Sequence, residues 1–130
     1  APEHTRCLVY EYLAGGDVFR RLHRSRQTSS PKHRPFLWYE RVSVCLDASI
    51  GLSHMHNSTP KAFHRDIKPP NILLDGSGGA KMADFGLSAT IKKQGQGHLT
   101  VQDISGTPGY ADPTYIQSGK VTEASEVYSF

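Results

Sequence analysis

Three adjoining strings decide the fold of this 130-residue chain: His64-Arg65-Asp66-Ile67-Lys68-Pro69-Pro70-Asn71, Ile72-Leu73-Leu74-Asp75 and Asp84-Phe85-Gly86. The middle string is typical of a short strand that runs into the Gly-rich turn 75–79, and residues 81–83 supply a second strand. Two carboxylates, one carboxamide and one ammonium group therefore lie on adjacent loops. Such a set of groups can hold magnesium, steady a triphosphate and orient a hydroxyl group.

The first and last of these strings resemble two motifs of eukaryotic protein kinases, H-R-D-x-K-x-x-N and D-F-G, in the order that the family has them. The strings L-V-Y-E-Y, G-T-P-G-Y-x-D-P and E-V-Y-S-F are similar to the tyrosine-kinase-like group, which includes plant receptor-like kinases with Ser/Thr specificity. The resemblance implies an α+β, mainly α fold. It covers the hinge and the upper part of the C-terminal lobe, with the N-terminal lobe missing.

We expect residues 1–130 to form one partial kinase domain, a piece of a larger domain whose core is incomplete here. A hinge strand is predicted over 6–13, and Asp17 is a plausible N-cap for a short helix over 18–23. A long helix is predicted from about 37 to 56. These helices correspond to the family's D and E helices. The catalytic loop, the activation segment with a long polar loop over 87–105, and the start of the F helix after Thr122 would follow.

The long helix is expected to bury a broad apolar stripe. Val42, Leu46, Ile50 and Met55 recur along it at near-helical spacing, with Cys45, Ala48 and Leu52 alongside. Side chains three or four residues apart lie on one face of a helix, so these residues predict a broad face that packs against the rest of the domain.

The resemblance implies the catalytic roles. Asp66 is expected to orient the substrate hydroxyl and to take its proton late, and Lys68 to neutralise charge on the transferred phosphoryl group. Asn71 and Asp84 are expected to hold Mg²⁺, which prefers oxygen ligands. The residues assigned to the activation and substrate loop are Arg65, Phe85, Gly86, Thr100, Ser105 and Thr107.

The resemblance also implies an ATP pocket. Tyr10 would be the gatekeeper, the backbone of Glu11 and Leu13 would bond the adenine, and Asp17 would reach the ribose hydroxyls. The full set of implied ATP-binding residues is Tyr10, Glu11, Leu13, Asp17, Lys68, Pro70, Asn71, Leu73, Ala83 and Asp84.

The activation segment carries two further expectations. Thr107 with Lys68 and Asp66 is the cluster usual in Ser/Thr-directed kinases. Arg65 beside the catalytic aspartate indicates control by loop phosphorylation, because its guanidinium group can clamp a phosphate through two hydrogen bonds. Thr100 and Ser105 are the candidate phosphorylation sites. Phe85 is expected to pack inward and to set the direction of Asp84, and Gly86 to give that turn its flexibility.

Two positions depart from the family pattern. Thr114 stands where the family usually has a Glu that anchors the substrate-docking loop through a buried ion pair. Glu126 stands where the family usually has an Asp that holds the backbone around the His-Arg-Asp turn. Because Glu is one methylene longer than Asp, we expect a looser fit at that turn.

Charge, cysteine spacing and hydrophobicity argue against several other kinds of function. The net charge is +3, and the segment from Arg20 to Arg34 is basic without an acid, yet no aromatic stacking platform accompanies it. A solvated loop is therefore favoured over nucleic-acid binding. Cys7 and Cys45 lack C-x-x-C spacing, which argues against a disulfide framework or a zinc site and fits a reducing compartment. No stretch resembles a signal peptide or a membrane span, so any membrane attachment is expected through segments outside this chain.

Two classes of function remain. The first is part of a Ser/Thr kinase that transfers the ATP γ-phosphoryl group to protein hydroxyls with Mg²⁺, in the cytoplasm or at the cytoplasmic side of a membrane. The alternative is a pseudokinase or a truncated scaffold that binds partners without catalysis. The visible catalytic positions all carry the reactive residue types, which favours the enzyme. Positioning and electrostatics supply most catalysis of phosphoryl transfer, so the isolated chain is expected to be inactive.

Overall fold

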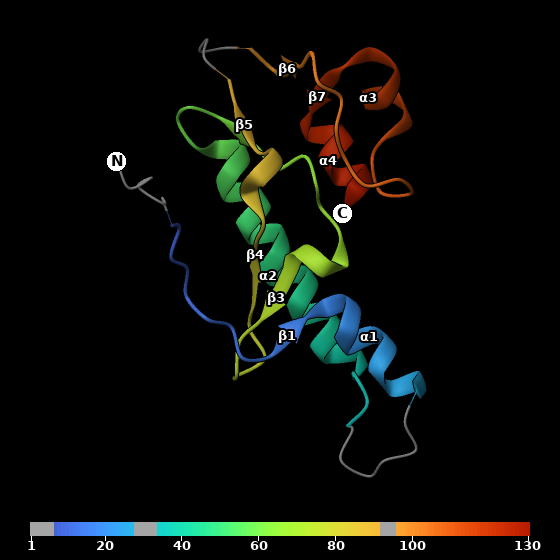
Figure 1. Ribbon diagram of the computed structural model, residues 1–130. Helices are drawn as coiled ribbons and strands as arrows, with labels where there is room; N and C mark the ends of the chain where they lie inside the picture. Colours follow the sequence, from blue (N-terminus) through green and yellow to red (C-terminus); the bar gives the residue numbers. More distant parts are fainter. Residues whose placement is uncertain (1–6, 28–33, 92–95) are drawn as a thin grey trace, which may run out of the picture.

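The long helix α2 (Trp38–Asn57) is the axis around which the other elements are arranged in Figure 1. This computed structural model describes residues 7–27, 34–91 and 96–130. Helix α1 (Val18–Gln27) lies beside the first turns of α2. A small sheet runs along α2. Helices α3 (Pro113–Ser118) and α4 (Glu123–Ser129) gather with the last strands at the other end (Figure 1).

The strands of the described residues form three small antiparallel sheets. The first has the order β1-β3-β4, with β1 (Gly16–Asp17), β3 (Ile72–Leu74) and β4 (Ala80–Met82). The second pairs β2 (Ala62–Phe63) with β5 (Ala89–Thr90), and the third pairs β6 (His98–Thr100) with β7 (Lys120–Thr122). Single 3₁₀ turns span Pro69–Asn71 and Phe85–Leu87. This assembly of helices and small sheets matches the expected α+β class.

The predicted long helix is confirmed within one residue at each end. At its start the Glu40 carboxylate accepts a hydrogen bond of 2.8 Å from the Leu37 backbone N–H, which satisfies one of the free donors of the first turn. At its end the Ser58 N–H and hydroxyl both donate to the Met55 carbonyl. The proline at position 60 then follows, so the helix ends at Asn57.

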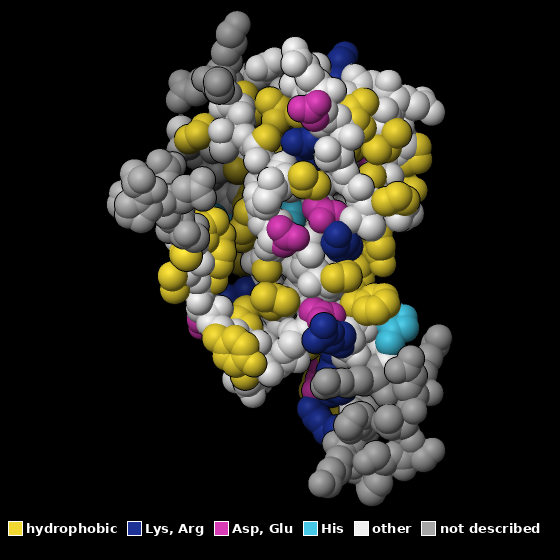
Figure 2. Space-filling model, viewed as in Figure 1, with side chains coloured by type: hydrophobic (Ala, Val, Ile, Leu, Met, Phe, Trp, Pro, Cys, Tyr) yellow, Lys and Arg dark blue, Asp and Glu magenta, His cyan; other side chains and the backbone are white. Residues whose placement is uncertain are grey.

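The predicted buried stripe of α2 is confirmed only for Ala48 and Leu52 and is wrong for most of its other residues. Val42, Leu46 and Ile50 are 48%, 58% and 59% exposed, whereas the buried residues of the helix are Val44, Ala48, Leu52 and His56. Strands β4 and β2 are the strands of the described residues that contact α2 most. Figure 2 shows hydrophobic side chains in several patches on the face in view.

Two further predictions of secondary structure need correction. Residues 7–13, the described part of the predicted hinge strand, form no strand, and Leu8 and Val9 are almost fully exposed. A strand requires a neighbour bound through backbone hydrogen bonds, and none of the described strands pairs with this segment. The predicted polar loop over 87–105 instead contains β5 and β6, which pair with β2 and β7.

Two apolar clusters hold the described residues together. One joins Val18 of α1, Phe36, Val44 of α2 and Leu74 of β3. The other lies beneath the C-terminal elements and contains Phe63, Ile91, Tyr115 and Val121. Residues 64–73 run from Phe63 of the second cluster to Leu74 of the first, so both clusters position the candidate site residues between them.

The connection from residues 7–13 into β1 depends on a glycine at position 15. Its N–H donates to the Leu74 carbonyl at 2.8 Å. A Cβ on Gly15 would lie 2.6 Å from that carbonyl oxygen and 2.7 Å from the Asp75 oxygen. No side chain fits so close to the backbone, so the approach of β1 to β3 requires glycine here.

We therefore expect Gly15→Ala to lower the free energy of unfolding by about 1–3 kcal/mol, since β1 must move away from β3. Gly76→Ala is the matched control, because a Cβ there meets nothing within 4 Å. Chemical denaturation of both variants checks this prediction. Equal effects of the two substitutions would show that the close approach does not matter.

Candidate active site

The Asp66 carboxylate is the centre of a hydrogen-bonded cluster formed by two segments of the chain, residues 66–71 and the stretch that carries Thr107. The Thr107 hydroxyl donates to its Oδ1 at 2.6 Å, and the Lys68 ammonium lies 2.8 Å from its Oδ2. Lys68 also donates to the Thr107 hydroxyl at 2.8 Å. The Asn71 amide donates to Asp66 Oδ2 at 3.0 Å and to the Asp66 carbonyl at 2.8 Å. The structure thus brings together four of the residues that the sequence marked.

These contacts keep Asp66 ionised. Burial alone raises the pKa of its carboxyl group, but the hydrogen bonds from Lys68, Thr107 and Asn71 and the Lys68 charge outweigh burial, so the pKa is lowered. A carboxylate has about four acceptor sites, and the side-chain donors occupy one on Oδ1 and two on Oδ2. One site on Oδ1 is left, which suits a single incoming hydroxyl group.

A cavity of about 590 Å³ lies beside this cluster, between residues 8–13, β3, β4 and the turn after β4. Eight of the ten residues assigned to ATP binding line it: Tyr10, Glu11, Leu13, Pro70, Asn71, Leu73, Ala83 and Asp84. Lys68 does not line it and lies in the Asp66 cluster instead. Three separate stretches of sequence thus line the cavity, and they include most of the residues assigned to ATP binding.

Asp17 also lies outside the cavity, because its carboxylate caps α1. Oδ1 accepts a hydrogen bond from the Arg20 N–H at 2.8 Å, and Oδ2 lies 3.2 Å from the Arg20 guanidinium. The predicted capping role of Asp17 is therefore confirmed. Its backbone pairs with Leu73 of β3, which lines the cavity.

Sequence reasoning missed several lining residues, notably Lys81 and Met82 of β4. Lys81 forms an ion pair with Glu11, which ties residues 8–13 to the sheet across the mouth of the cavity. The family resemblance identified Ala83, which lines the cavity, but gave no signal for the pair of Lys81 with Glu11, 70 positions away in the sequence.

Asn71 and Asp84 fit a magnesium ion. Among the described residues, no three His, Cys, Asp or Glu side chains lie close enough together to bind a metal ion. A metal site made only of these side chains is therefore not found in this part of the chain. Mg²⁺ needs only one or two protein ligands when phosphate oxygens and waters complete its shell. Asn71 is buried with its amide nitrogen fixed by Asp66, which leaves its oxygen for a ligand. Asp84 adopts a left-handed backbone conformation, with φ of 63°, and is exposed toward the same cavity.

Phe85 does not pack inward as expected. Its ring contacts the His64 imidazole, with centroids 5.2 Å apart, but it remains 44% exposed. His64 itself is fully buried and its Nε2 lies 3.0 Å from the Ala83 carbonyl oxygen. Gly86 donates to the Asp84 carboxylate at 3.4 Å, a long hydrogen bond. The described residues therefore cover one side of Phe85 only.

Arg65 joins the activation segment to the catalytic loop. Its guanidinium group donates to the carbonyls of Leu87 and Asp103 at 3.1 and 2.7 Å and to the Tyr115 hydroxyl at 3.0 Å. The Tyr115 hydroxyl in turn donates to the Ser105 carbonyl at 2.8 Å. The Arg65 Nε is buried without a partner among the described residues. Of the two candidate phosphorylation sites, Ser105 lies in this network, whereas Thr100 is exposed on β6.

Glu126 holds the backbone of the catalytic loop from the far end of the chain. Its Oε1 accepts a hydrogen bond of 2.7 Å from the Arg65 N–H, and its Oε2 lies 2.7 Å from the His56 Nε2. Its side chain is 3% exposed. The expected looser fit is therefore not found, because His56 at the end of α2 fixes the second oxygen of the longer side chain. Thr122 begins helix α4, as predicted, through a hydrogen bond from Ser125 N–H.

We expect Glu126→Ala to lower the free energy of unfolding by at least about 3 kcal/mol, since a buried N–H and a buried imidazole lose their partner. Glu123→Ala is the matched control, because Glu123 pairs with Lys61 at the surface and such pairs contribute about 1 kcal/mol or less. Denaturant unfolding of both variants measures the difference. Similar losses would contradict the role given to Glu126.

A second prediction concerns the charge of Asp66. Its lowered pKa means that its contribution to stability is complete above the ordinary value of 3.8 and is lost as the pH falls through the lower native value. Lys68→Met removes the strongest compensating donor, so the pKa of Asp66 should rise. Carboxyl ¹³C NMR titration checks this, with Lys61→Met as the control that leaves Asp66 unchanged. A titration midpoint that is the same in all three proteins would contradict the assigned cause.

Comparison with known proteins agrees with this geometry. Residues 1–130 match the family model described as "Protein kinase domain". In Arabidopsis thaliana, a probable LRR receptor-like serine/threonine-protein kinase is 40% identical over 124 residues, which cover 95% of this chain and 14% of that protein. LysM domain receptor-like kinase 3 is 40% identical over 124 residues, covering 95% and 19%. LRR receptor-like serine/threonine-protein kinase FEI 2 is 39% identical over 127 residues, covering 97% and 20%.

The chain thus spans at most about a fifth of the length of these relatives. Within the described residues, none of the helices combines the length and the apolar character needed to cross a bilayer. The order of the motifs, the Asp66 cluster and the family match agree, and the chain belongs to the protein kinase family, in which it is related to plant receptor-like serine/threonine kinases.

Proposed function

We propose that the full-length protein transfers the γ-phosphoryl group of ATP to serine and threonine hydroxyls of protein substrates. One observation carries this proposal. The Asp66 carboxylate, with Lys68 and Thr107 bound to it, adjoins a cavity that Asn71 and Asp84 line. The names of the relatives support the Ser/Thr specificity.

In the proposed reaction, the substrate hydroxyl donates a hydrogen bond to the open acceptor site of Asp66. The hydroxyl oxygen forms a bond to the γ-phosphorus while the bond from that phosphorus to the bridging oxygen of ADP breaks. A carboxylate with a lowered pKa is a weak base, so Asp66 chiefly orients the hydroxyl and takes its proton late. Lys68 offsets negative charge on the phosphoryl group as it moves.

Asn71 and Asp84 would hold magnesium in this arrangement. When bound, the metal ion neutralises charge on the phosphates. The hydrogen bonds from Asn71 to Asp66 then join the metal-binding residue to the residue that orients the hydroxyl. A single buried amide therefore sets the distance between the two halves of the site.

We assign the nucleotide base to the cavity beside residues 8–13. Leu73 and Ala83 would floor the adenine pocket with apolar contacts, the backbone of Glu11 and Leu13 would bond the edge of the base, and Tyr10 would close the space behind it. Pro70 would line the sugar. Asp17 would share its carboxylate between the ribose and Arg20, because it already caps α1.

In terms of the family's architecture, we propose that residues 7–13 are the hinge and that α1 and α2 are its D and E helices. Helix α4 would then be the start of its F helix. Together these elements would make up the upper part of the C-terminal lobe. The two exposed, unpaired cysteines, Cys7 and Cys45, and the receptor-like relatives support a location in the cytoplasm or at the cytoplasmic side of a membrane.

We further propose that loop phosphorylation regulates the enzyme. Arg65 already holds the loop through Asp103 and Tyr115, and Tyr115 holds Ser105, so a phosphate near Ser105 or Thr100 would add charge to an existing network. Mass spectrometry of the active full-length protein should find phosphate within residues 87–107. A fully active protein without phosphate there would contradict this regulation.

Nucleotide binding tests the metal assignment. We expect ATP to raise the melting temperature of the full-length protein only with Mg²⁺, and this shift should vanish in Asp84→Ala, because one metal ligand is lost. Asp103→Ala is the matched control, since Asp103 is an exposed aspartate in the same segment. An Asp84→Ala protein with an unchanged Mg²⁺-dependent shift would overturn the assignment.

Phosphate transfer tests the catalytic assignment. Asp66→Asn should lower kcat of the full-length protein by about 10²–10⁴-fold while its ATP-dependent thermal shift persists.

Residues 1–130 alone should show no transfer above that of the same chain carrying Asp66→Asn, because the cavity wall at Leu8 and Tyr10 is largely exposed. Transfer well above this control would contradict the expected inactivity. A full-length protein that binds ATP but never transfers phosphate would favour the scaffold alternative.

A further inference from the structure

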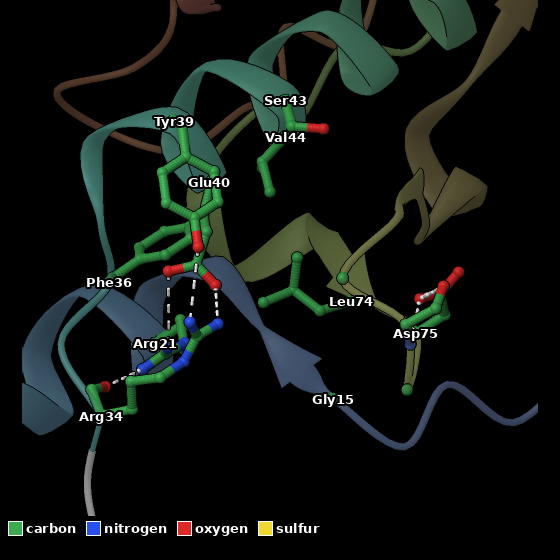
Figure 3. A pocket seen from close by; sticks show the side chains of 13 residues that line it. Gly15, Arg21, Arg34, Phe36, Tyr39, Glu40, Ser43, Val44, Leu74 and Asp75 are labelled. Atoms are coloured by element: carbon green, nitrogen blue, oxygen red, sulfur yellow. Dashed lines mark hydrogen bonds and ion pairs between the residues drawn. The ribbon is translucent and has the colours of Figure 1, made fainter.

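A second cavity, of about 450 Å³, lies on the other face of β3 from the nucleotide cavity. Leu73 lines the nucleotide cavity and Leu74 the second one, since successive side chains of a strand point to opposite faces. Figure 3 shows its walls, the first turns of α2 on one side and the turn that carries Asp75 on the other. The cavity falls within the size range of ligand pockets, and no role proposed above uses it.

The floor of this cavity is apolar. Phe36, Val44 and Leu74 are all less than 8% exposed and belong to one buried cluster. The guanidinium groups of Arg21 and Arg41 lie 5.1 and 5.6 Å from the centre of the Phe36 ring. Because the ring is buried beneath these groups, it offers no face to a nucleic-acid base. The floor suits an aliphatic side chain instead.

The rim is positively charged on the side of α1. Arg34 forms an ion pair with Glu40, and the Arg21 guanidinium lies 4.0 Å from the same carboxylate, so two cations face one anion (Figure 3). Arg21 is held in place by hydrogen bonds to the carbonyls of Arg34 and Pro35 at 2.7 and 3.3 Å. This arrangement leaves one positive charge in excess on the α1 side of the rim, and the Asp75 carboxylate is the anion of the opposite wall.

Arg34 has donors to spare. Its side chain is 61% exposed, and its hydrogen bonds go to the Tyr39 hydroxyl, at 3.5 Å, and to Glu40. A guanidinium group has five N–H donors, so it can bind a second carboxylate. On the opposite wall the Asp75 Oδ1 accepts hydrogen bonds from Ser77 and Gly79 of its own turn, which ties that carboxylate to the turn.

The surrounding sequence favours an acidic partner. Residues 17–41 contain seven lysines and arginines and two acids, although the net charge of the whole chain is only +3. This segment therefore carries all of the excess positive charge, and two of its arginines, Arg21 and Arg34, line the cavity. Charge complementarity of this kind steers acidic partners toward a surface and helps to orient them there.

We propose that this cavity binds an acidic segment of a partner protein, with one aliphatic side chain on the floor of Phe36, Val44 and Leu74 and a neighbouring carboxylate on Arg34. A peptide uses both the apolar floor and the basic rim, whereas a nucleic acid uses only the rim. Binding here requires no phosphoryl transfer, so the proposal stands apart from the catalytic function.

Fluorescence anisotropy of the full-length protein with a labelled peptide, Gly-Glu-Glu-Leu-Glu-Glu-Gly, tests the proposal. Arg34→Gln should weaken binding about tenfold, because a charge-assisted hydrogen bond is lost. Arg20→Gln, which removes the same charge from an exposed side chain outside the cavity, should leave the affinity within twofold. Ser43→Trp, which places an indole at the cavity wall, should abolish binding, whereas Ser49→Trp on the same helix should not.

A peptide with serine in place of its leucine should bind at least fivefold more weakly. Three results would overturn the proposal. The first is no binding of the leucine peptide at millimolar concentration. The second is equal weakening by Arg34→Gln and Arg20→Gln, which would indicate diffuse charge. The third is tighter binding of a twelve-residue oligothymidylate than of the peptide, which would assign the surface to nucleic acid. Unchanged melting temperatures of the variants ensure that lost binding reflects the cavity.

Discussion

One buried carboxylate links the candidate active site to the rest of the fold. Glu126 of α4 binds the Arg65 N–H in the catalytic loop and His56 at the end of α2. Arg65 has a positive φ of 69°, a conformation that non-glycine residues adopt only when the surroundings impose it. Its side chain then reaches the activation segment. Glu126 thus fixes the loop that carries Asp66 relative to helices α2 and α4. Arg65 in turn fixes the segment that carries Thr107 relative to that loop.

Asp66 shows how this support becomes chemistry. Its carboxylate accepts hydrogen bonds from three side chains that come from both sides of the β3–β4 hairpin, and the pKa remains low although the group is largely buried. These donors restrict the rotation of the carboxylate and so hold it in one orientation. Phosphoryl transfer depends on positioning more than on base strength, and a fixed, ionised oxygen with one open acceptor site meets that need.

The sequence predicted the local features well and the packing less well. Motif spacing located Asp66, Lys68, Asn71 and Thr107, and helix-capping residues such as Thr122 located the helix starts. The sequence predicted Ala48 and Leu52 in the buried stripe of α2 but added the exposed Val42, Leu46 and Ile50, because both faces are apolar and only the placement of β4 and β2 decides between them. The predicted strand over 6–13 failed for a related reason, since strand propensity needs a partner. Nothing in the sequence predicted the pair of His56 with Glu126, which are 70 residues apart.

The central claim is that Asp66, Lys68, Asn71 and Asp84 surround one metal-bound triphosphate. A crystal structure of the full-length kinase domain with Mg²⁺ and a non-hydrolysable ATP analogue tests it most directly. We predict a metal ion bound by the Asn71 and Asp84 oxygens at about 2.0–2.1 Å, with Lys68 turned from Asp66 toward the γ-phosphate. A nucleotide bound elsewhere, or a metal ion that neither Asn71 nor Asp84 contacts, would contradict the account.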